Sequence, residues 1–130
     1  VLFNKIDTAF TYLDKETELF RVVNVPMKDT MEEYVALAAK TANEQKEYFT
    51  GPLGNDVFQF SPMPWVSYTH ISHTNSGKKD NATPLFDWGK YFERDGKTLL
   101  PFSVQAHHSF VDGLHIGKLA DKVQRFLDEY

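Results

Sequence analysis

The sequence contains no cysteine among its 130 residues. The chain therefore forms no disulfide bond, and it offers no thiolate for a zinc site or for nucleophilic catalysis. No apolar run approaches the roughly 20 residues that a membrane-spanning helix requires, and no signal peptide is recognisable. The sequence also lacks a basic run, and its formal net charge is −4, so it has no field that would attract nucleic-acid phosphates. We expect no membrane insertion, no nucleic-acid binding and a cytoplasmic location.

The composition is that of an ordinary globular protein rich in aromatic residues. Hydrophobic residues make up 42% of the sequence and aromatic residues 15%, including eleven Phe. This length is enough for one domain with one core, and the aromatic content predicts a sheet core or an aromatic-lined pocket. The chain begins at Val1 rather than Met, inside an apolar run. We therefore expect residues 1–130 to be the C-terminal part of a single domain whose N-terminal portion is missing.

Two segments have the pattern of amphipathic helices. Thr30 and Glu33 have the spacing of a capping box, in which the threonine side chain accepts a hydrogen bond from the Glu33 amide. Apolar residues then recur at helical spacing, which predicts a helix over residues 31–48. A second helix is expected after Gly113, with its apolar face packed on a sheet. The residues of that face are Ile116, Leu119, Ala120, Val123, Phe126, Leu127 and Tyr130.

Strand patterns occupy much of the remaining sequence. Residues 19–25 are rich in β-branched and aromatic side chains and end at Pro26, which predicts a strand. Asp95-Gly96 is a strong hairpin signal, and it joins predicted strands at 85–92 and 98–107. Other strand-like segments lie at residues 1–6, from residue 10 onward and at 66–72, and residues 75–84 are expected to form a surface loop. This order of elements predicts an α+β fold with a mixed, largely antiparallel sheet covered by helices.

The pair His107-His108 lies where the last predicted strand ends. Histidine is the side chain best suited to proton transfer near neutral pH, and a strand end can hold it over a cleft. Asp112 follows closely and either caps the second helix or fixes the loop through an ion pair. Spacing alone leaves two alternatives, a hydrogen-bonded structural pair or a metal site shared with His115. Metal binding is disfavoured because the cluster lacks the helical spacing of the HExxH motif.

The residues around these histidines resemble a known family. His-His-x-x-x-Asp-Gly, at residues 107–113, is the signature of the coenzyme-A-dependent acyltransferase superfamily, which includes the acyltransferase cores of dehydrogenase complexes and peptide-synthetase condensation domains. Further segments resemble chloramphenicol acetyltransferases in particular, in the same order along the chain. These segments are Ser61-Pro62-Met63-Pro64-Trp65, Gly89-Lys90-Tyr91, Pro101-Phe102-Ser103-Val104-Gln105 and Gly113-Leu114-His115.

The resemblance implies a chloramphenicol-acetyltransferase-like two-layer sandwich and an acetyl-CoA-dependent O-acetyltransferase. It implies direct transfer of the acetyl group to a hydroxyl of chloramphenicol, which inactivates the antibiotic and gives resistance. Acetyl-CoA is the implied co-substrate, and no metal is implied. The family is trimeric, so the resemblance also implies a homotrimer with active sites between subunits. A separate N-terminal segment of the same protein is a further candidate partner.

The resemblance assigns roles to individual residues. His108 matches the general base, and Ser61 matches the hydroxyl that donates to the oxyanion. Asp112 matches a supporting aspartate that pairs with an arginine from the missing N-terminal portion. The positions near coenzyme A are Trp65, Lys90 and Tyr91, and the acceptor-binding positions are Phe10, Tyr12, Gln59 and Ile71.

The sequence also departs from the family pattern. Asp87 stands where the family usually has a threonine near a bound water, and Tyr12 replaces a small residue of the acceptor pocket. These departures favour another hydroxylated acceptor as an alternative to chloramphenicol. A second alternative is a non-catalytic fragment or binding module without its N-terminal segment. A condensation-domain fragment is disfavoured by the Pro-Trp segment that follows Ser61.

Overall fold

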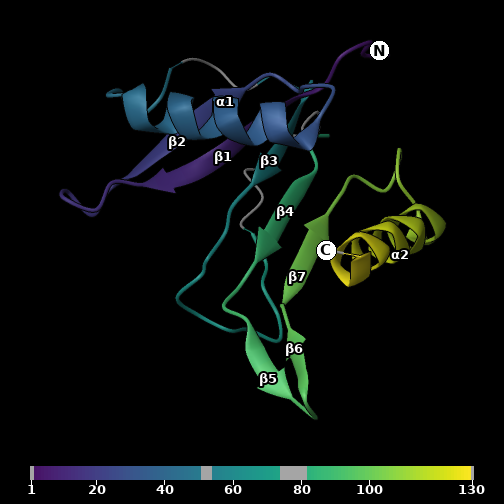
Figure 1. Cartoon of the computed structure of the whole chain (residues 1–130). Helices are drawn as coiled ribbons and strands as arrows, with labels where there is room; N and C mark the ends of the chain where they lie inside the picture. Colours follow the sequence, from purple (N-terminus) through teal and green to yellow (C-terminus); the bar gives the residue numbers. More distant parts are fainter. Residues whose placement is uncertain (1, 51–53, 74–81, 130) are drawn as a thin grey trace.

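The computed structural model describes residues 2–50, 54–73 and 82–129. They form an α+β fold with a mixed sheet and two helices, as predicted, and the strands are divided between a five-stranded sheet and a separate two-stranded sheet (Figure 1). Strand order in the larger sheet is β2-β1-β3-β4-β7. The elements are β1 (Asp7–Leu13), β2 (Phe20–Val25), α1 (Met31–Glu44), β3 (Val57–Phe60), β4 (Leu85–Trp88), β5 (Phe92–Arg94), β6 (Lys97–Leu99), β7 (Phe102–Gln105) and α2 (Gly113–Glu129).

The centre of the five-stranded sheet is parallel and its two outer pairs are antiparallel. β3 pairs in parallel with both β1 and β4, whereas β2 pairs with β1 and β7 with β4 in antiparallel fashion. Counting the pair β5–β6, three strand pairs are antiparallel and two are parallel among the described residues, which agrees with the expected mixed, largely antiparallel sheet. Parallel neighbours end at the same edge of a sheet, so the residues that follow β3 and β4 lie together there. The amide of Ser61 donates to the Phe86 carbonyl at 2.9 Å, and that of Met63 donates to the Trp88 carbonyl at 2.8 Å.

Helix α1 packs on the β1–β2 end of the sheet and forms the main core with it (Figure 1). The predicted cap is confirmed, because the Thr30 hydroxyl oxygen accepts a hydrogen bond from the Glu33 amide at 3.2 Å. The helix ends at Glu44, earlier than the predicted residue 48, because Gln45 is extended and its side-chain amide donates to the carbonyl oxygens of Val22 and Glu47. The buried core residues here are Val23, Val25 and Ala42.

Aromatic rings form a continuous row across the other half of the sheet, but none of them is fully buried in this chain. Phe60 and Phe86 stack with ring centroids 5.3 Å apart, and Phe86 also stacks on Phe102 of β7 at 6.4 Å. Phe58 meets Phe86 edge-on at 5.7 Å, and Trp88 lies 6.2 Å from Phe60. Such contacts add roughly 0.5–1.5 kcal/mol per pair to the stabilisation from burial.

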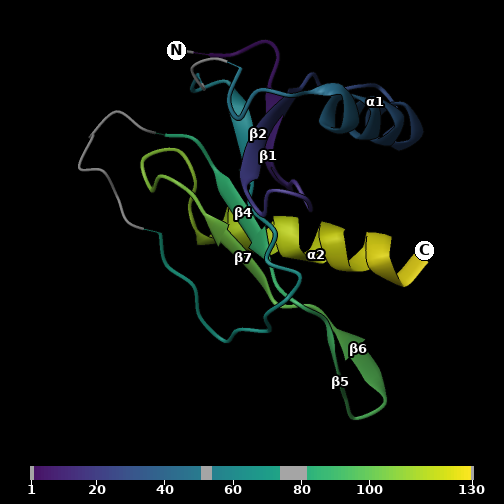
Figure 2. The same cartoon turned by 90° about the vertical axis from the view of Figure 1, so that its left-hand side faces the viewer.

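The predicted hairpin around Asp95-Gly96 is present, but each of its two predicted strands is interrupted. The first is divided into β4 and β5, and the second into β6 and β7. Asp95 and Gly96 have φ values of 53° and 73°, as a two-residue hairpin of the primed type requires. β5 and β6 flank this turn and extend away from the larger sheet (Figure 2). The ladder stops at Pro101, which has no amide hydrogen to donate, and the Gly89 amide donates to the Pro101 carbonyl at 3.0 Å instead.

Two predicted strands are absent from the described residues. Residues 2–6 and 66–72 contain no strand, while residue 1 lies outside the described part of the chain. Apolar and polar residues alternate at 66–72, but this segment does not pair with a neighbouring strand. It makes isolated backbone hydrogen bonds instead, such as the one from the Lys90 amide to the Val66 carbonyl at 2.8 Å. The predicted loop at 75–84 falls mostly outside the described residues.

Helix α2 is amphipathic as predicted, but its apolar face is not buried. It lies at the β4–β7 end of the sheet (Figure 1), and none of its described residues is buried. Leu114, Phe126 and Leu127 are each at least half exposed, whereas Ile116 and Leu119 are half-buried. The expectation of an apolar face packed on the sheet is therefore wrong for this single chain, because no described residue of that face is buried.

Candidate active site

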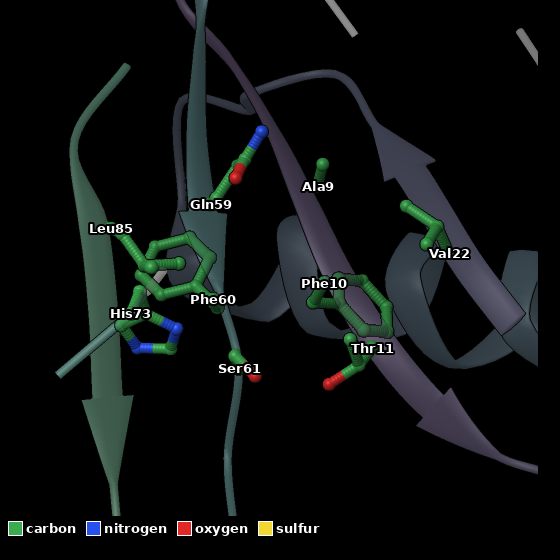
Figure 3. Close-up of a pocket in the computed structure, with 9 residues that line it drawn as sticks. All are labelled: Ala9, Phe10, Thr11, Val22, Gln59, Phe60, Ser61, His73 and Leu85. Carbon is green, nitrogen blue, oxygen red and sulfur yellow. The ribbon is translucent and has the colours of Figure 1, made fainter. Parts of the chain in front are cut away.

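A cavity of about 230 Å³ opens on one face of the sheet (Figure 3). Ala9, Gln59 and Leu85 are register partners on β1, β3 and β4, so their side chains point to the same face. Phe60 and Phe86 are paired, and continuing that register by one residue places Ser61 beside Asp87. The cavity is lined by Ala9, Phe10, Thr11, Val22, Gln59, Phe60, Ser61, His73 and Leu85.

Ser61 follows β3 directly, at the C-terminal end of this central strand. Its amide donates to the Phe86 carbonyl at 2.9 Å, and its half-buried side chain contributes to the cavity wall. Figure 3 shows its hydroxyl at the same end of the cavity as the His73 ring. The amide hydrogen bond fixes the Ser61 backbone beside the cavity, and the hydroxyl can serve there as a hydrogen-bond donor to a reacting oxygen.

The structure brings some of the predicted acceptor-binding residues to this cavity. Phe10 and Gln59 line it together with Ser61. Tyr12 is not in the lining, and its hydroxyl donates to the side-chain oxygen of Asn43 on α1 at 3.1 Å. Ile71 is half-buried and is also outside the lining. Their assignment to the acceptor pocket therefore stays a prediction.

His73 and Asp87 form a polar pair at the cavity that sequence reasoning missed. Nε2 of His73 lies 2.9 Å from Oδ2 of Asp87. Asp87 is completely buried, whereas the His73 side chain keeps 31% of its exposure and lines the cavity. Asp87 attracted attention in the sequence as a departure from the family pattern, but no spacing rule links it to His73.

Tyr68 lies against the same buried carboxylate region. Burial raises the pKa of the Tyr68 phenol, and the negative charge of Asp87 raises that pKa further. The Tyr68 hydroxyl and Oδ1 of Asp87 are both buried and have no hydrogen-bond partner among the described residues. An unsatisfied buried polar atom is costly, and neither Tyr68 nor Asp87 is among the residues that line the cavity.

The two motif histidines lie elsewhere, in the loop between β7 and α2. Both are exposed, and the His107 ring accepts a hydrogen bond at Nδ1 from the Ser109 amide at 3.2 Å. His107 also borders a second cavity of about 510 Å³, together with Phe110 and Val57. His108 does not line the cavity of Ser61. Within one chain, the predicted base and the predicted oxyanion donor do not share a cavity.

Asp112 caps helix α2 in this structure. Its carboxylate oxygen Oδ1 accepts hydrogen bonds from the amides of Leu114 at 3.0 Å and His115 at 3.4 Å. Nδ1 of His115 also lies 3.0 Å from this oxygen. Among the two structural roles considered for this residue, the described residues show the cap. Pairing with an arginine of an N-terminal portion stays a prediction.

The residues predicted near coenzyme A lie on the surface, in the segments that follow β3 and β4. Trp65 is 55% exposed and Tyr91 is 65% exposed, and Lys90 is exposed as well. The Trp65 ring meets Phe20 of β2 edge-on at 6.1 Å. The backbone hydrogen bond from Lys90 to Val66 holds the two segments together. Exposed flat rings and a cation near one edge can contact a nucleotide.

Within residues 2–50, 54–73 and 82–129, no group of three or more histidine or acidic side chains is placed to hold a metal ion. None of the helices in that part of the chain could cross a membrane.

A family model described as chloramphenicol acetyltransferase matches residues 1–124. The chain belongs to the chloramphenicol acetyltransferase family. A chloramphenicol acetyltransferase of Klebsiella sp is 26% identical to this family member over 133 residues, which is 100% of the chain and 61% of the relative. The enzyme of the same name from Streptomyces acrimycini is 34% identical over 128 residues, which is 94% of the chain and 57% of the relative.

Solved structures show the same fold. A chloramphenicol acetyltransferase superposes with a TM-score of 0.84 at 24% identity, over 97% of this chain and 63% of that protein. A dihydrolipoamide acetyltransferase of Azotobacter vinelandii superposes with a TM-score of 0.61 at 15% identity, over 98% of this chain and 55% of that protein. The chain thus spans about three fifths of the length of the chloramphenicol acetyltransferases it matches.

Proposed function

We propose that the protein containing this chain is an acetyl-CoA-dependent O-acetyltransferase that acts on a hydroxyl of chloramphenicol or of another hydroxylated acceptor. The observation that carries the proposal is the position of Ser61 in a cavity with Phe10 and Gln59, in a chain of the chloramphenicol acetyltransferase family. Transfer to chloramphenicol would inactivate the antibiotic and give resistance.

His108 is the proposed general base. Its imidazole takes the proton of the acceptor hydroxyl, whose oxygen attacks the carbonyl carbon of the acetyl thioester. The Ser61 hydroxyl donates a hydrogen bond to the resulting oxyanion, an interaction worth about 3–4 kcal/mol in comparable sites. The carbon–sulfur bond then breaks, the acetyl ester leaves with the acceptor, and the thiolate of coenzyme A takes the proton back from His108. No covalent enzyme intermediate forms.

The proposal includes a homotrimer with active sites between subunits. His108 is exposed and lies outside the cavity of Ser61 in the single chain. A neighbouring subunit that brings its own histidine loop over this cavity would complete the site, and it would also cover apolar side chains of the loop and of α2, such as the exposed Phe110 and Leu114. A ring of three identical contacts satisfies this requirement at every site.

The direct test is an acetyl-transfer assay on the complete protein. Purified protein is incubated with acetyl-CoA and chloramphenicol, and the release of free coenzyme A is followed with a thiol reagent. Release that depends on chloramphenicol supports the drug as acceptor. Release only with other alcohols supports the same chemistry on another acceptor. The absence of release with every hydroxylated compound tested contradicts the enzymatic proposal and favours a binding module.

A further inference from the structure

His73 and Asp87 form a hydrogen-bonded pair that the proposed acetyl transfer does not use. Nε2 of His73 lies 2.9 Å from Oδ2 of Asp87, whose side chain is completely buried. The His73 ring is partly exposed and lines the cavity of Ser61, whereas Asp87 is not among the lining residues. The carboxylate therefore lies behind the ring, and the ring is the part of the pair that a molecule in the cavity can reach.

The contact with Asp87 fixes the chemical state of the His73 ring. A carboxylate only accepts hydrogen bonds, so Nε2 of the neutral ring carries the hydrogen and Nδ1 has a free lone pair. A buried carboxylate that orients an imidazole in this way prepares the ring to act as a general base. The same carboxylate stabilises the imidazolium that forms when His73 takes a proton.

Ser61 supplies the second polar group that this chemistry needs. Ser61 and His73 both line the cavity, and Figure 3 shows the serine hydroxyl and the imidazole at the same end of it. In the described part of the chain, the His73 side chain is hydrogen-bonded to Asp87 alone, so Ser61 is not paired with it as an activated nucleophile. Water is the nucleophile that His73 can activate here, and the Ser61 hydroxyl is available to donate to an oxyanion.

We infer that His73, oriented by Asp87, gives this chain a second activity beyond acetyl transfer, the hydrolysis of small carboxylic esters. Apolar side chains of Ala9, Val22 and Leu85 line the same cavity. Its volume of about 230 Å³ is below the range that is usual for drug-sized ligands. The substrate class is therefore an ester of a short acid, such as acetic acid, with a small alcohol or phenol.

The reaction consumes one water molecule for each ester. Nδ1 of His73 takes a proton from the water while the water oxygen forms a bond to the carbonyl carbon. The carbonyl oxygen becomes an oxyanion, to which the Ser61 hydroxyl donates a hydrogen bond. The bond from this carbon to the alkoxy oxygen then breaks, and the leaving oxygen takes the proton from His73. The products are a carboxylic acid and an alcohol or phenol.

Hydrolysis of phenyl acetate by the complete protein tests the role of His73. The release of phenol is followed by absorbance in the absence of acetyl-CoA. H73Q keeps an amide donor for Asp87 but has no basic nitrogen, so it should fold and lose about 100-fold or more in kcat, the usual contribution of a general base. H70Q is the matched control, because His70 is exposed and outside the cavity lining, and it should hydrolyse phenyl acetate at the wild-type rate.

Two further measurements separate catalysis from a structural role. Imidazole added to H73A should restore part of the hydrolysis by acting as the base in the space of the lost ring, with wild type in the same imidazole solution as control. In D87N, an amide hydrogen donated to Nε2 would place the ring hydrogen on Nδ1, which removes the base. Asp87 is a positioning residue, so D87N should lower kcat with little change in KM or melting temperature.

H108A shows whether hydrolysis and acetyl transfer are separate activities. His108 does not line the cavity of Ser61 and His73, so H108A should lose acetyl transfer and still hydrolyse phenyl acetate. Loss of hydrolysis in H108A, an unchanged kcat in folded H73Q, or no hydrolysis by the wild type overturns the second activity. None of these three results contradicts acetyl transfer, which is measured separately with acetyl-CoA and a hydroxylated acceptor.

Discussion

Ser61 lines the cavity on the open face of the sheet, whereas His108 lies exposed in the loop between β7 and α2 and is not part of that cavity. If subunits share active sites, these two residues act together only across an interface. Single H108A and S61A variants should both lose acetyl transfer, H108A almost completely and S61A by about 100-fold or more in kcat with little change in KM.

A mixture of the two variants distinguishes shared sites from sites within one chain. When H108A and S61A subunits assemble at random in equal amounts, about one quarter of shared sites combine an intact His108 with an intact Ser61. Co-expressed and co-purified variants should therefore regain about one quarter of wild-type activity. Separately purified variants, mixed without reassembly, are the control. No recovery in the co-assembled protein contradicts the interfacial site.

Replacing Asp112 should destabilise helix α2. Its carboxylate caps the helix by accepting from the amides of Leu114 and His115, and the loss of such a cap costs about 1 kcal/mol. D112A should therefore lower the free energy of unfolding by about that amount in a urea titration followed by circular dichroism. D121A, at an exposed position within the same helix, is the matched control and should change the free energy by less than about 0.5 kcal/mol. Equal effects of D112A and D121A on the free energy of unfolding would show that the Asp112 carboxylate does not stabilise the helix as a cap.

Gly89 should not tolerate a larger side chain. A Cβ at this position would lie 2.6 Å from the Val66 carbonyl oxygen and 3.0 Å from the Tyr68 ring, and relief of such a clash costs about 1–3 kcal/mol. G89A should lower the melting temperature measurably in a thermal scan. G117A is the opposite control, since Gly117 is in α2 and has open space around it; alanine there should stabilise the helix by about 0.5–1 kcal/mol. A neutral G89A would contradict the close approach of these segments.

Asp14 makes stability depend on pH in the acid range. The amides of Glu16 and Thr17 donate to its carboxylate, and Arg21 pairs with it, so the pKa of Asp14 is lowered from 3.8. A lowered pKa in the folded state means that the stabilisation is present above the ordinary value and is lost as the pH falls through the folded-state pKa. D14N should be less stable than wild type at about pH 7, and the difference should shrink at about pH 3 in urea titrations.

The matched control for Asp14 is D29N, which removes the same charge from an exposed residue. Its difference from wild type should be small and should change little between these two conditions. A D14N difference that stays constant as the pH falls would mean that the carboxylate interactions do not stabilise the turn.

Local signals in the sequence predicted local structure well. The Thr30 cap, the Asp95-Gly96 turn and the strand ending before Pro26 are each encoded by a few adjacent residues, and the structure confirms them. The end of α1 could not be predicted, because Gln45 leaves the helix to bond Val22 on a distant strand. The burial of α2 could not be predicted either, since amphipathic spacing shows which face is apolar but not what covers it.

The same difference between local signals and long-range contacts applies to the candidate site. Ser61, Phe10 and Gln59 came from a resemblance between linear motifs, and the structure gathers them in one cavity. The pair of His73 and Asp87 could not be predicted because it depends on a loop returning to the edge of β4. Neither residue belongs to a motif with its partner, so only the three-dimensional arrangement relates them.

The parallel pairing of β1 with β3 has a consequence for the order of folding. β1 and β2 are joined by a short turn, whereas Asp7 can pair with Val57 only after the whole of α1 has been synthesised. Closing so long a loop is slow compared with forming a hairpin or a helix. The cavity is lined by residues from β1, β2, β3 and β4, so it is complete only when β3 has joined β1 and β4 has joined β3. We therefore expect the α1 side of the sheet to form before the cavity is complete.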